Sequence, residues 1–169
     1  LAFINPGDGV LLPNPGYPTY TSVSRLAEAE LFTYDLTEEN NWEPDFDALE
    51  QLPLDKIKLM WVNYPHMPTG KRASIELFQK LIDFGRKHNI VIVNDNPYSF
   101  ILNDNPLSIF NIEGAKDIAV EFGSLSKTYN MTGFRIGYVV GNKEIIKSLS
   151  ILKSNIDTGQ FAPIQKAAA

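Results

Sequence analysis

Three short apolar runs, spaced about 30 residues apart, constrain the fold of this chain more than any other feature. They cover residues 58–63 (KLMWVN), 90–94 (IVIVN) and 119–123 (AVEFG). Short runs that are apolar almost throughout are typical of strands buried on both faces of a parallel sheet. Their spacing matches the length of a βαβ unit. The sequence therefore predicts an alternating α/β fold with core parallel strands.

Further helices and strands are expected around these runs. Ser74 is the expected N-cap of a helix that ends near Asn89. The apolar face of that helix consists of Leu77, Phe78, Leu81, Ile82 and Phe84. Additional strands are expected at residues 10–12, 31–36 and 136–140, and additional helices at 21–29, 45–52, 145–152 and 165–169.

Composition and charge exclude several classes of function. A net charge of -5 without any basic run argues against a nucleic-acid partner. The chain has no cysteine, which rules out disulfides and thiolate chemistry. Its two histidines, His66 and His88, form no predicted metal site, and His88 is expected on the solvent face at a helix end. No apolar run is long enough to cross a bilayer, so no membrane partner is expected, and the cytoplasm is the expected location.

Polar residues follow the three core runs directly. Asn63 ends the first run, Asp95 follows the second and Ser124 follows the third. Ligands of open α/β sheets bind in the crevice beyond the carboxyl ends of the strands. The sequence therefore predicts a ligand site where these three residues meet.

Lys127 is the most reactive residue near that expected site. It lies in Gly-Ser-Leu-Ser-Lys, together with Ser124 and Ser126, and Arg135 follows eight positions later. Hydroxyl and guanidinium groups can bind the phosphate of an aldehyde cofactor while the lysine amine forms an imine with its carbonyl carbon. Taken alone, Lys127 is equally well interpreted as a solvated lysine at a strand end.

Asp95, Tyr98 and Tyr17 each have an ordinary interpretation as well. Asp95 suits an Asx-turn or a helix cap, but its carboxylate could also stabilise a protonated pyridine nitrogen. Tyr98 could be an ordinary core aromatic residue, or its hydroxyl could donate to a phenolate oxygen on the same pyridine ring. Tyr17 lies in a proline-rich loop that could hold its ring against a flat ligand.

Four motifs, in order along the chain, resemble the fold-type I pyridoxal-phosphate enzymes, and within them the aspartate and aromatic aminotransferases of class I and II. The motifs are PNPGYPTY from Pro13, NYPHMPTG from Asn63, NDNPYSF from Asn94 and GSLSKTYNMTGFRIG from Gly123. The resemblance implies a three-layer α/β/α sandwich with a mostly parallel central sheet. It also implies that residues 1–169 are part of the large cofactor-binding domain, without a flanking N-terminal segment and a small C-terminal domain.

The resemblance assigns a role to each candidate residue toward pyridoxal 5'-phosphate. Lys127 corresponds to the lysine that forms the internal aldimine and later moves the substrate Cα proton. Asp95 corresponds to the partner of the pyridine nitrogen. Tyr98 corresponds to the donor to the 3′ oxygen. The residues that correspond to phosphate ligands are Ser124, Ser126 and Arg135. Tyr17 and Pro97 correspond to the two residues on the ring faces.

The implied function is transfer of an amino group between an amino acid and a 2-oxo acid, in a full-length protein expected to be a homodimer. Residues 158–161 are expected to approach the partner's site, and the isolated chain is expected to be poorly active. Two alternatives stay open. One is a carbon-sulfur lyase or related lyase on the same scaffold, and the other is a non-catalytic aminotransferase-like sensing domain of a regulator.

Met67 departs from the family pattern. An asparagine usually stands there, and its amide donates to the cofactor's 3′ oxygen, whereas methionine has no such donor. Loss of a donor to the phenolate favours the protonated imine. We therefore predict a higher imine pKa than in relatives that carry the asparagine.

Overall fold

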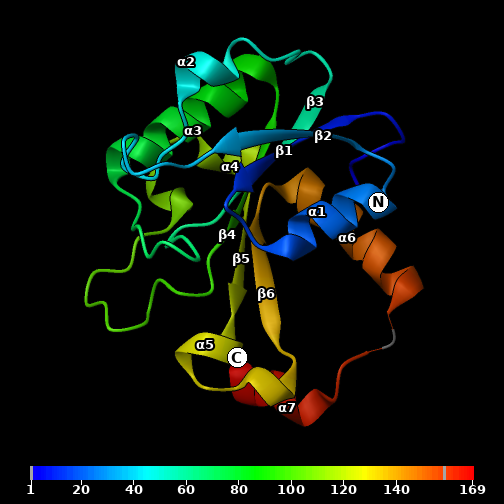
Figure 1. Ribbon diagram of the computed structural model, residues 1–169. Coiled ribbons are helices and arrows are strands. Elements are labelled where there is room, and N and C mark those ends of the chain that lie inside the picture. Colours follow the sequence, from blue (N-terminus) through cyan, green and yellow to red (C-terminus); the bar gives the residue numbers. More distant parts are fainter. Residues whose placement is uncertain (1, 158) are drawn as a thin grey trace.

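The computed structural model describes residues 2–157 and 159–169 and contains one six-stranded sheet (Figure 1). The strands lie in the order β2-β1-β3-β4-β5-β6. Their bounds are β1 Gly9–Asn14, β2 Glu30–Asp35, β3 Ile57–Val62, β4 Val91–Asp95, β5 Ala119–Ser124 and β6 Gly137–Gly141. The first five strands run parallel, and β6 is antiparallel to β5. The predicted, mostly parallel α/β sheet is confirmed.

Helices connect the strands and follow the last one. The α-helices are α1 Pro18–Leu26, α2 Phe46–Leu49, α3 Ile75–His88, α4 Ala115–Ile118, α5 Leu125–Thr128, α6 Lys143–Ile156 and α7 Ala162–Ala168. Two short 3₁₀ turns, η1 Ile109–Asn111 and η2 Thr132–Phe134, complete the set. Each connection between successive parallel strands thus leaves the sheet and returns to it.

The two faces of the sheet are covered by different helices, as Figure 1 shows. On one face, strand residues such as Leu11, Met60 and Ile92 pack in one buried cluster with Leu77 and Phe78 of α3. The opposite face carries a second cluster in which strand residues pack against α1 and α6; it includes Val10, Leu12, Tyr20, Leu59, Val93, Val120, Ile145 and Ile146. Because successive strand residues point to opposite faces, one strand supplies both clusters. The expected three-layer sandwich is confirmed.

Helix α3 begins and ends where the sequence indicates. The hydroxyl of Ser74 accepts a hydrogen bond from the Leu77 amide at 3.1 Å, and Asn89 ends the helix in the left-handed conformation, with φ 55°. Gly85 faces β4 so closely that an added Cβ would lie 2.8 Å from the carbonyl oxygen of Ile90. The helix can therefore lie this near the sheet because residue 85 has no side chain.

Three local predictions differ from the structure. Helix α1 begins at Pro18, three residues before the expected start, because proline suits the first turn of a helix. Helix α2 has four residues rather than the expected eight. His88, expected on the solvent face, instead packs its ring 4.9 Å from that of Phe84, and its Nε2 lies 2.9 Å from Glu50 Oε1.

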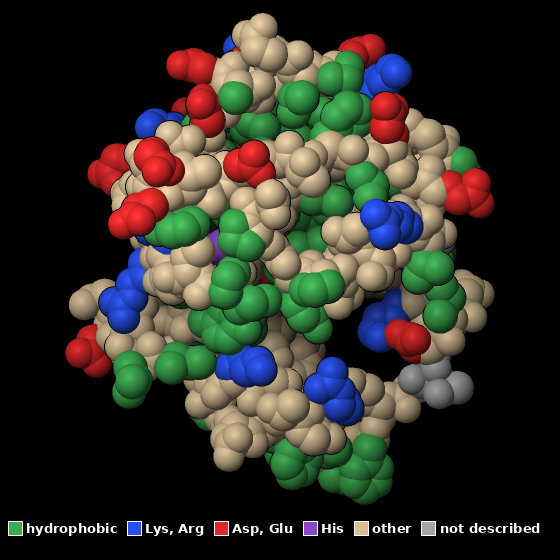
Figure 2. All heavy atoms as spheres, viewed as in Figure 1, with side chains coloured by type: hydrophobic (Ala, Val, Ile, Leu, Met, Phe, Trp, Pro, Cys, Tyr) green, Lys and Arg blue, Asp and Glu red, His purple; other side chains and the backbone are tan. Residues whose placement is uncertain are grey.

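The surface seen in Figure 2 carries lysine and arginine side chains scattered among acidic ones rather than gathered into one patch. Within residues 2–157 and 159–169, no helix is long and apolar enough to span a bilayer.

A hollow of about 420 Å³ lies between α1, α6 and the sheet, and its lining is almost entirely apolar.

Beyond the carboxyl end of β5, the chain forms a separate group of short helices. Helices α5 and α7 lie together below the sheet in Figure 1. Thr128 and Tyr129 line one cavity with Ala167 to Ala169, which shows that these two segments are neighbours. The residues from Ser124 to Arg135 therefore stand at the edge of the molecule's main body.

Candidate active site

The polar residues at the ends of β3 and β4 form direct contacts. Val62 pairs with Asn94 in the sheet, which places Asn63 beside Asp95. The amide nitrogen of Asn63 donates to the backbone carbonyl of Asp95 at 2.6 Å, and its oxygen accepts from the backbone amide of Met67 at 2.9 Å. Asn63 therefore ties the loop after β3 to the end of β4, as the predicted convergence of strand ends requires.

The carboxylate of Asp95 has one oxygen bound by a tyrosine. The hydroxyl of Tyr20 donates to Oδ2 of Asp95 at 2.6 Å. Burial raises the pKa of Asp95, and the hydrogen bond from Tyr20 acts against that rise. The pKa of Tyr20 is also raised, chiefly by burial and then by the Asp95 charge. The pair therefore consists of a carboxyl that resists ionisation and a phenol that keeps its proton.

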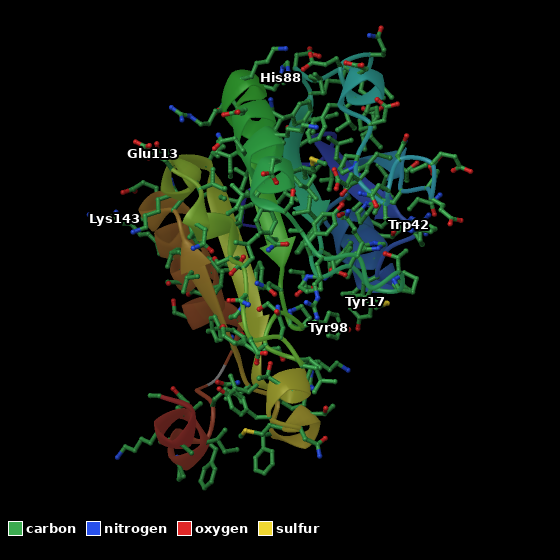
Figure 3. All side chains as sticks on the ribbon, turned by 90° about the vertical axis from the view of Figure 1, so that its left-hand side faces the viewer. Tyr17, Trp42, His88, Tyr98, Glu113 and Lys143 are labelled. Carbon is green, nitrogen blue, oxygen red and sulfur yellow. The ribbon has the colours of Figure 1, made fainter. Side chains whose placement is uncertain are left out.

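Tyr17 and Tyr98 lie around this pair. Figure 3 shows both at the same end of the sheet. The ring of Tyr17 is 46% exposed and meets that of Tyr20 edge to face, at 5.7 Å. Burial raises the pKa of Tyr98, and the nearby Asp95 charge raises it further. Pro97 is half-buried in the same turn.

Lys127 and its two serines occupy the segment directly after β5. Ser124 ends the strand and caps α5, since its hydroxyl accepts from the Ser126 amide at 3.1 Å. Lys127 lies in this single helical turn and is exposed. Within the part of the chain that the structure describes, no hydrogen bond or ion pair joins Lys127 to Asp95.

Arg135 faces its own loop. Its backbone is in the left-handed region, with φ 53°, and its guanidinium donates to the Thr132 carbonyl at 2.9 Å. Its own carbonyl accepts from the Gln160 side chain at 2.7 Å. Among the described residues, Arg135 has no hydrogen bond to Ser124 or Ser126.

Residues 158–161 form the segment expected to approach a partner subunit, and Thr158 lies outside the described residues.

His66 connects two loops of the site without belonging to a metal centre. Its Nδ1 lies 2.8 Å from the Thr69 hydroxyl and its Nε2 lies 3.1 Å from the carbonyl oxygen of Pro15. Burial lowers the pKa of His66. No group of three or more His, Cys, Asp or Glu side chains suited to a metal ion exists within residues 2–157 and 159–169.

Sequence reasoning missed the contribution of Tyr20. This residue ends the motif Pro-Asn-Pro-Gly-Tyr-Pro-Thr-Tyr, three positions after Tyr17. Pro18 in the first turn of a helix, with an aromatic residue two positions later, would have placed Tyr20 on the first turn of α1. The signal was therefore present, but its partner Asp95 is 75 positions away along the chain.

The assembled groups fit the pyridine half of pyridoxal phosphate. Asp95 offers a carboxylate oxygen, Tyr98 a hydroxyl donor and Tyr17 an exposed aromatic face. A carboxylate whose burial raises its pKa is stabilised by a cationic partner, which a protonated pyridine nitrogen supplies. The phosphate half has suitable donors on one segment in Ser124, Ser126 and Arg135.

The whole chain, residues 1–169, matches the family model described as aminotransferase class I and II. It is 47% identical over 169 residues to the LL-diaminopimelate aminotransferase of Aquifex aeolicus, covering 99% of this chain and 44% of that protein. It is 48% identical over 170 residues to LL-diaminopimelate aminotransferase 2 of Trichormus variabilis, with the same coverage. The chain therefore spans less than half the length of these relatives.

Solved structures give the same result. Apo-BacF from Bacillus subtilis aligns with a TM-score of 0.95 at 40% identity, over 99% of this chain and 43% of that one. A probable N-succinyldiaminopimelate aminotransferase from Thermus thermophilus aligns with a TM-score of 0.89 at 34% identity, over 95% and 44%. This chain therefore belongs to the class I and II aminotransferases, a family that depends on pyridoxal phosphate.

Proposed function

We propose that the full-length protein is a pyridoxal-phosphate-dependent aminotransferase that moves an amino group between an amino acid and a 2-oxo acid. The observation that supports this proposal best is the half-buried Asp95 at the end of β4, with Tyr17 and Tyr98 nearby. The named relatives are aminotransferases, which favours this function over a lyase or a sensing domain. The chain itself would form part of the large cofactor-binding domain.

Each candidate residue has a chemical task in this proposal. Bound pyridoxal phosphate supplies an aldehyde that takes up the amino group and a ring that stores the electron pair released at the substrate Cα. Lys127 Nζ would hold the aldehyde carbon of the cofactor and would serve as the base for the Cα proton. Asp95 would keep the proton on the ring nitrogen, and Tyr98 Oη would donate to the 3′ oxygen.

The remaining residues bind and orient the cofactor. The hydroxyls of Ser124 and Ser126 and the guanidinium of Arg135 would hold the phosphate. Tyr17 and Pro97 would pack against the ring. Such contacts would keep the reacting carbon near Lys127, which favours efficient transfer.

The first amino donor to test is LL-diaminopimelate, because curated relatives with 46 to 48% identity to this chain carry that substrate in their names. Purified full-length protein would be assayed with LL-diaminopimelate, aspartate and phenylalanine, each with 2-oxoglutarate, while glutamate formation is followed. Glutamate formed with any donor supports the reaction class. Absence of glutamate with all three donors, together with release of pyruvate and ammonia from cystathionine in a parallel assay, would contradict it.

Attachment of the cofactor at Lys127 has its own test. Full-length protein would be incubated with pyridoxal phosphate, reduced with borohydride and digested, and the modified peptide would be located by mass spectrometry. The adduct is expected on Lys127 and absent in Lys127→Arg, which keeps the charge. An adduct on another lysine would contradict the assignment.

We further propose that the full-length protein is a homodimer located in the cytoplasm. The homodimer is what the resemblance to the class I and II aminotransferases implies. Light scattering of the purified protein would measure the oligomeric state, and fractionation of cells that express it would give the location.

A further inference from the structure

We propose that Tyr20 is a positioning residue that keeps Asp95 ionised and leaves one oxygen of its carboxylate free for the cofactor's ring nitrogen. The inference rests on the proposed function and adds to it a residue outside the expected cofactor contacts. Tyr20 acts through Asp95, so it is not a catalytic residue. Its hydroxyl binds Oδ2 at 2.6 Å. Within the described residues, Oδ1 has no hydrogen-bond partner.

The Tyr20 ring has little freedom to move. It is 4% exposed and stacks on the indole of Trp61, with centroids 4.7 Å apart and planes inclined by 12°. Trp61 stacks in turn against Phe122, at 6.1 Å. Because these rings come from α1, β3 and β5, the phenol is held by three elements of the sandwich. A hydroxyl fixed in this way can fix the carboxylate that it binds.

The electrostatic environment explains why Asp95 requires a donor. Burial raises the pKa of Asp95, and a neutral carboxyl cannot hold a proton on a pyridine nitrogen. The titratable groups that face Asp95 are Tyr20 and Tyr98, with Tyr17 beside both tyrosines, and none of them is a cation. The Tyr20 hydrogen bond is therefore the protein interaction that favours the ionised form before the cofactor binds.

A double-mutant cycle tests this role. Dissociation constants of pyridoxal phosphate would be measured for full-length wild type, Tyr20→Phe, Asp95→Asn and the double variant, between pH 6 and 8. Tyr20→Phe should weaken binding about tenfold at pH 7, the size expected for a lost hydrogen bond to a charged group. The loss should grow toward pH 6 and should vanish in the Asp95→Asn background.

Tyr34→Phe is the matched control. Tyr34 is also buried, and its hydroxyl donates to the Trp61 carbonyl at 2.6 Å, away from Asp95. Its removal should leave the cofactor dissociation constant unchanged. Equal losses in Tyr34→Phe and Tyr20→Phe, or an undiminished Tyr20→Phe loss in the Asp95→Asn background, would overturn the inference.

A second replacement covers the case in which Tyr20→Phe does not fold. Genetic incorporation of 3-fluorotyrosine at position 20 keeps the ring and the hydroxyl but makes the donor more acidic. Cofactor affinity should then persist to a lower pH than in wild type, opposite to the effect of phenylalanine. An unchanged pH profile would overturn the inference.

The borohydride experiment separates the two proposals. If the wild type carries its adduct on Lys127 and Tyr20→Phe behaves like Tyr34→Phe, the inference about Tyr20 fails while the proposed function stands. If the wild type forms no adduct on Lys127, the proposed function fails and the inference fails with it.

Discussion

The imidazole of His66 connects the loop after β3 to the carbonyl oxygen of Pro15, 51 positions earlier in the chain, at 3.1 Å from Nε2. Its other nitrogen lies 2.8 Å from the Thr69 hydroxyl. The loop that carries Tyr17 is thus attached to the loop that carries Met67. This contact orders two segments of the candidate site through one buried ring.

The His66 contact predicts a loss of stability in mild acid. Burial lowers the pKa of His66 below its ordinary 6.5, so the neutral ring stabilises the fold above that pH. The contribution is lost as the pH falls from 6.5 through the lowered value. In urea unfolding, the stability advantage of wild type over His66→Gln should shrink from pH 8 to pH 5. His88→Gln is the control variant, and a constant advantage would contradict the prediction.

Asp95→Asn should stabilise the cofactor-free protein in a pH-dependent way. Burial raises the pKa of Asp95 above its ordinary 3.8, so ionisation of this half-buried carboxyl costs stability. That cost grows as the pH rises from 3.8 through the raised value. The unfolding free energy of Asp95→Asn relative to wild type should therefore increase from pH 4 to pH 7. An equal difference at every pH would show that Asp95 is not perturbed.

Much of the fold could be predicted because it depends on local patterns. The three core strands, and helix α3 with its caps Ser74 and Asn89, were readable from apolar periodicity and capping chemistry. The contacts of the site were not readable, since they join distant residues. The bond from Tyr20 to Asp95 spans 75 positions, and no local pattern indicates which carboxylate a buried phenol binds.

Glu121 should be important for stability, although it lies outside the candidate site. Its buried carboxylate accepts hydrogen bonds from Asn94 Nδ2 at 2.8 Å, Ser108 Oγ at 2.9 Å and the Ile109 amide at 3.0 Å. Glu121→Ala leaves these donors without their acceptor, and we expect a cost of about 3 kcal/mol. Urea unfolding would measure it. Glu113→Ala, at an exposed position, should change stability by less than about 0.5 kcal/mol.

Met67→Asn should shift the pH dependence of the bound cofactor's absorbance. The backbone amide of Met67 is bound to Asn63, but the thioether offers no donor to the cofactor's 3′ oxygen. An asparagine would add one, which stabilises the phenolate. We expect the midpoint of a spectral titration of the full-length holoprotein to fall in Met67→Asn. Met67→Leu, which adds no donor, should keep the wild-type midpoint.

The order of the strands also determines how the chain must fold. Each parallel pair joins segments separated by a helical crossover: Val10 pairs with Leu59, and Met60 with Ile92. Within the described residues, β5 and β6 are the one antiparallel pair. These two strands follow each other in sequence, and no helix crosses the sheet between them. In the other pairs the partner residues lie between 21 positions apart, as Gly9 and Glu30 do, and 49 positions apart, as Val10 and Leu59 do. Loops of that length must close before these pairs gain their contacts. Refolding should therefore be slow compared with that of a helical bundle of similar length.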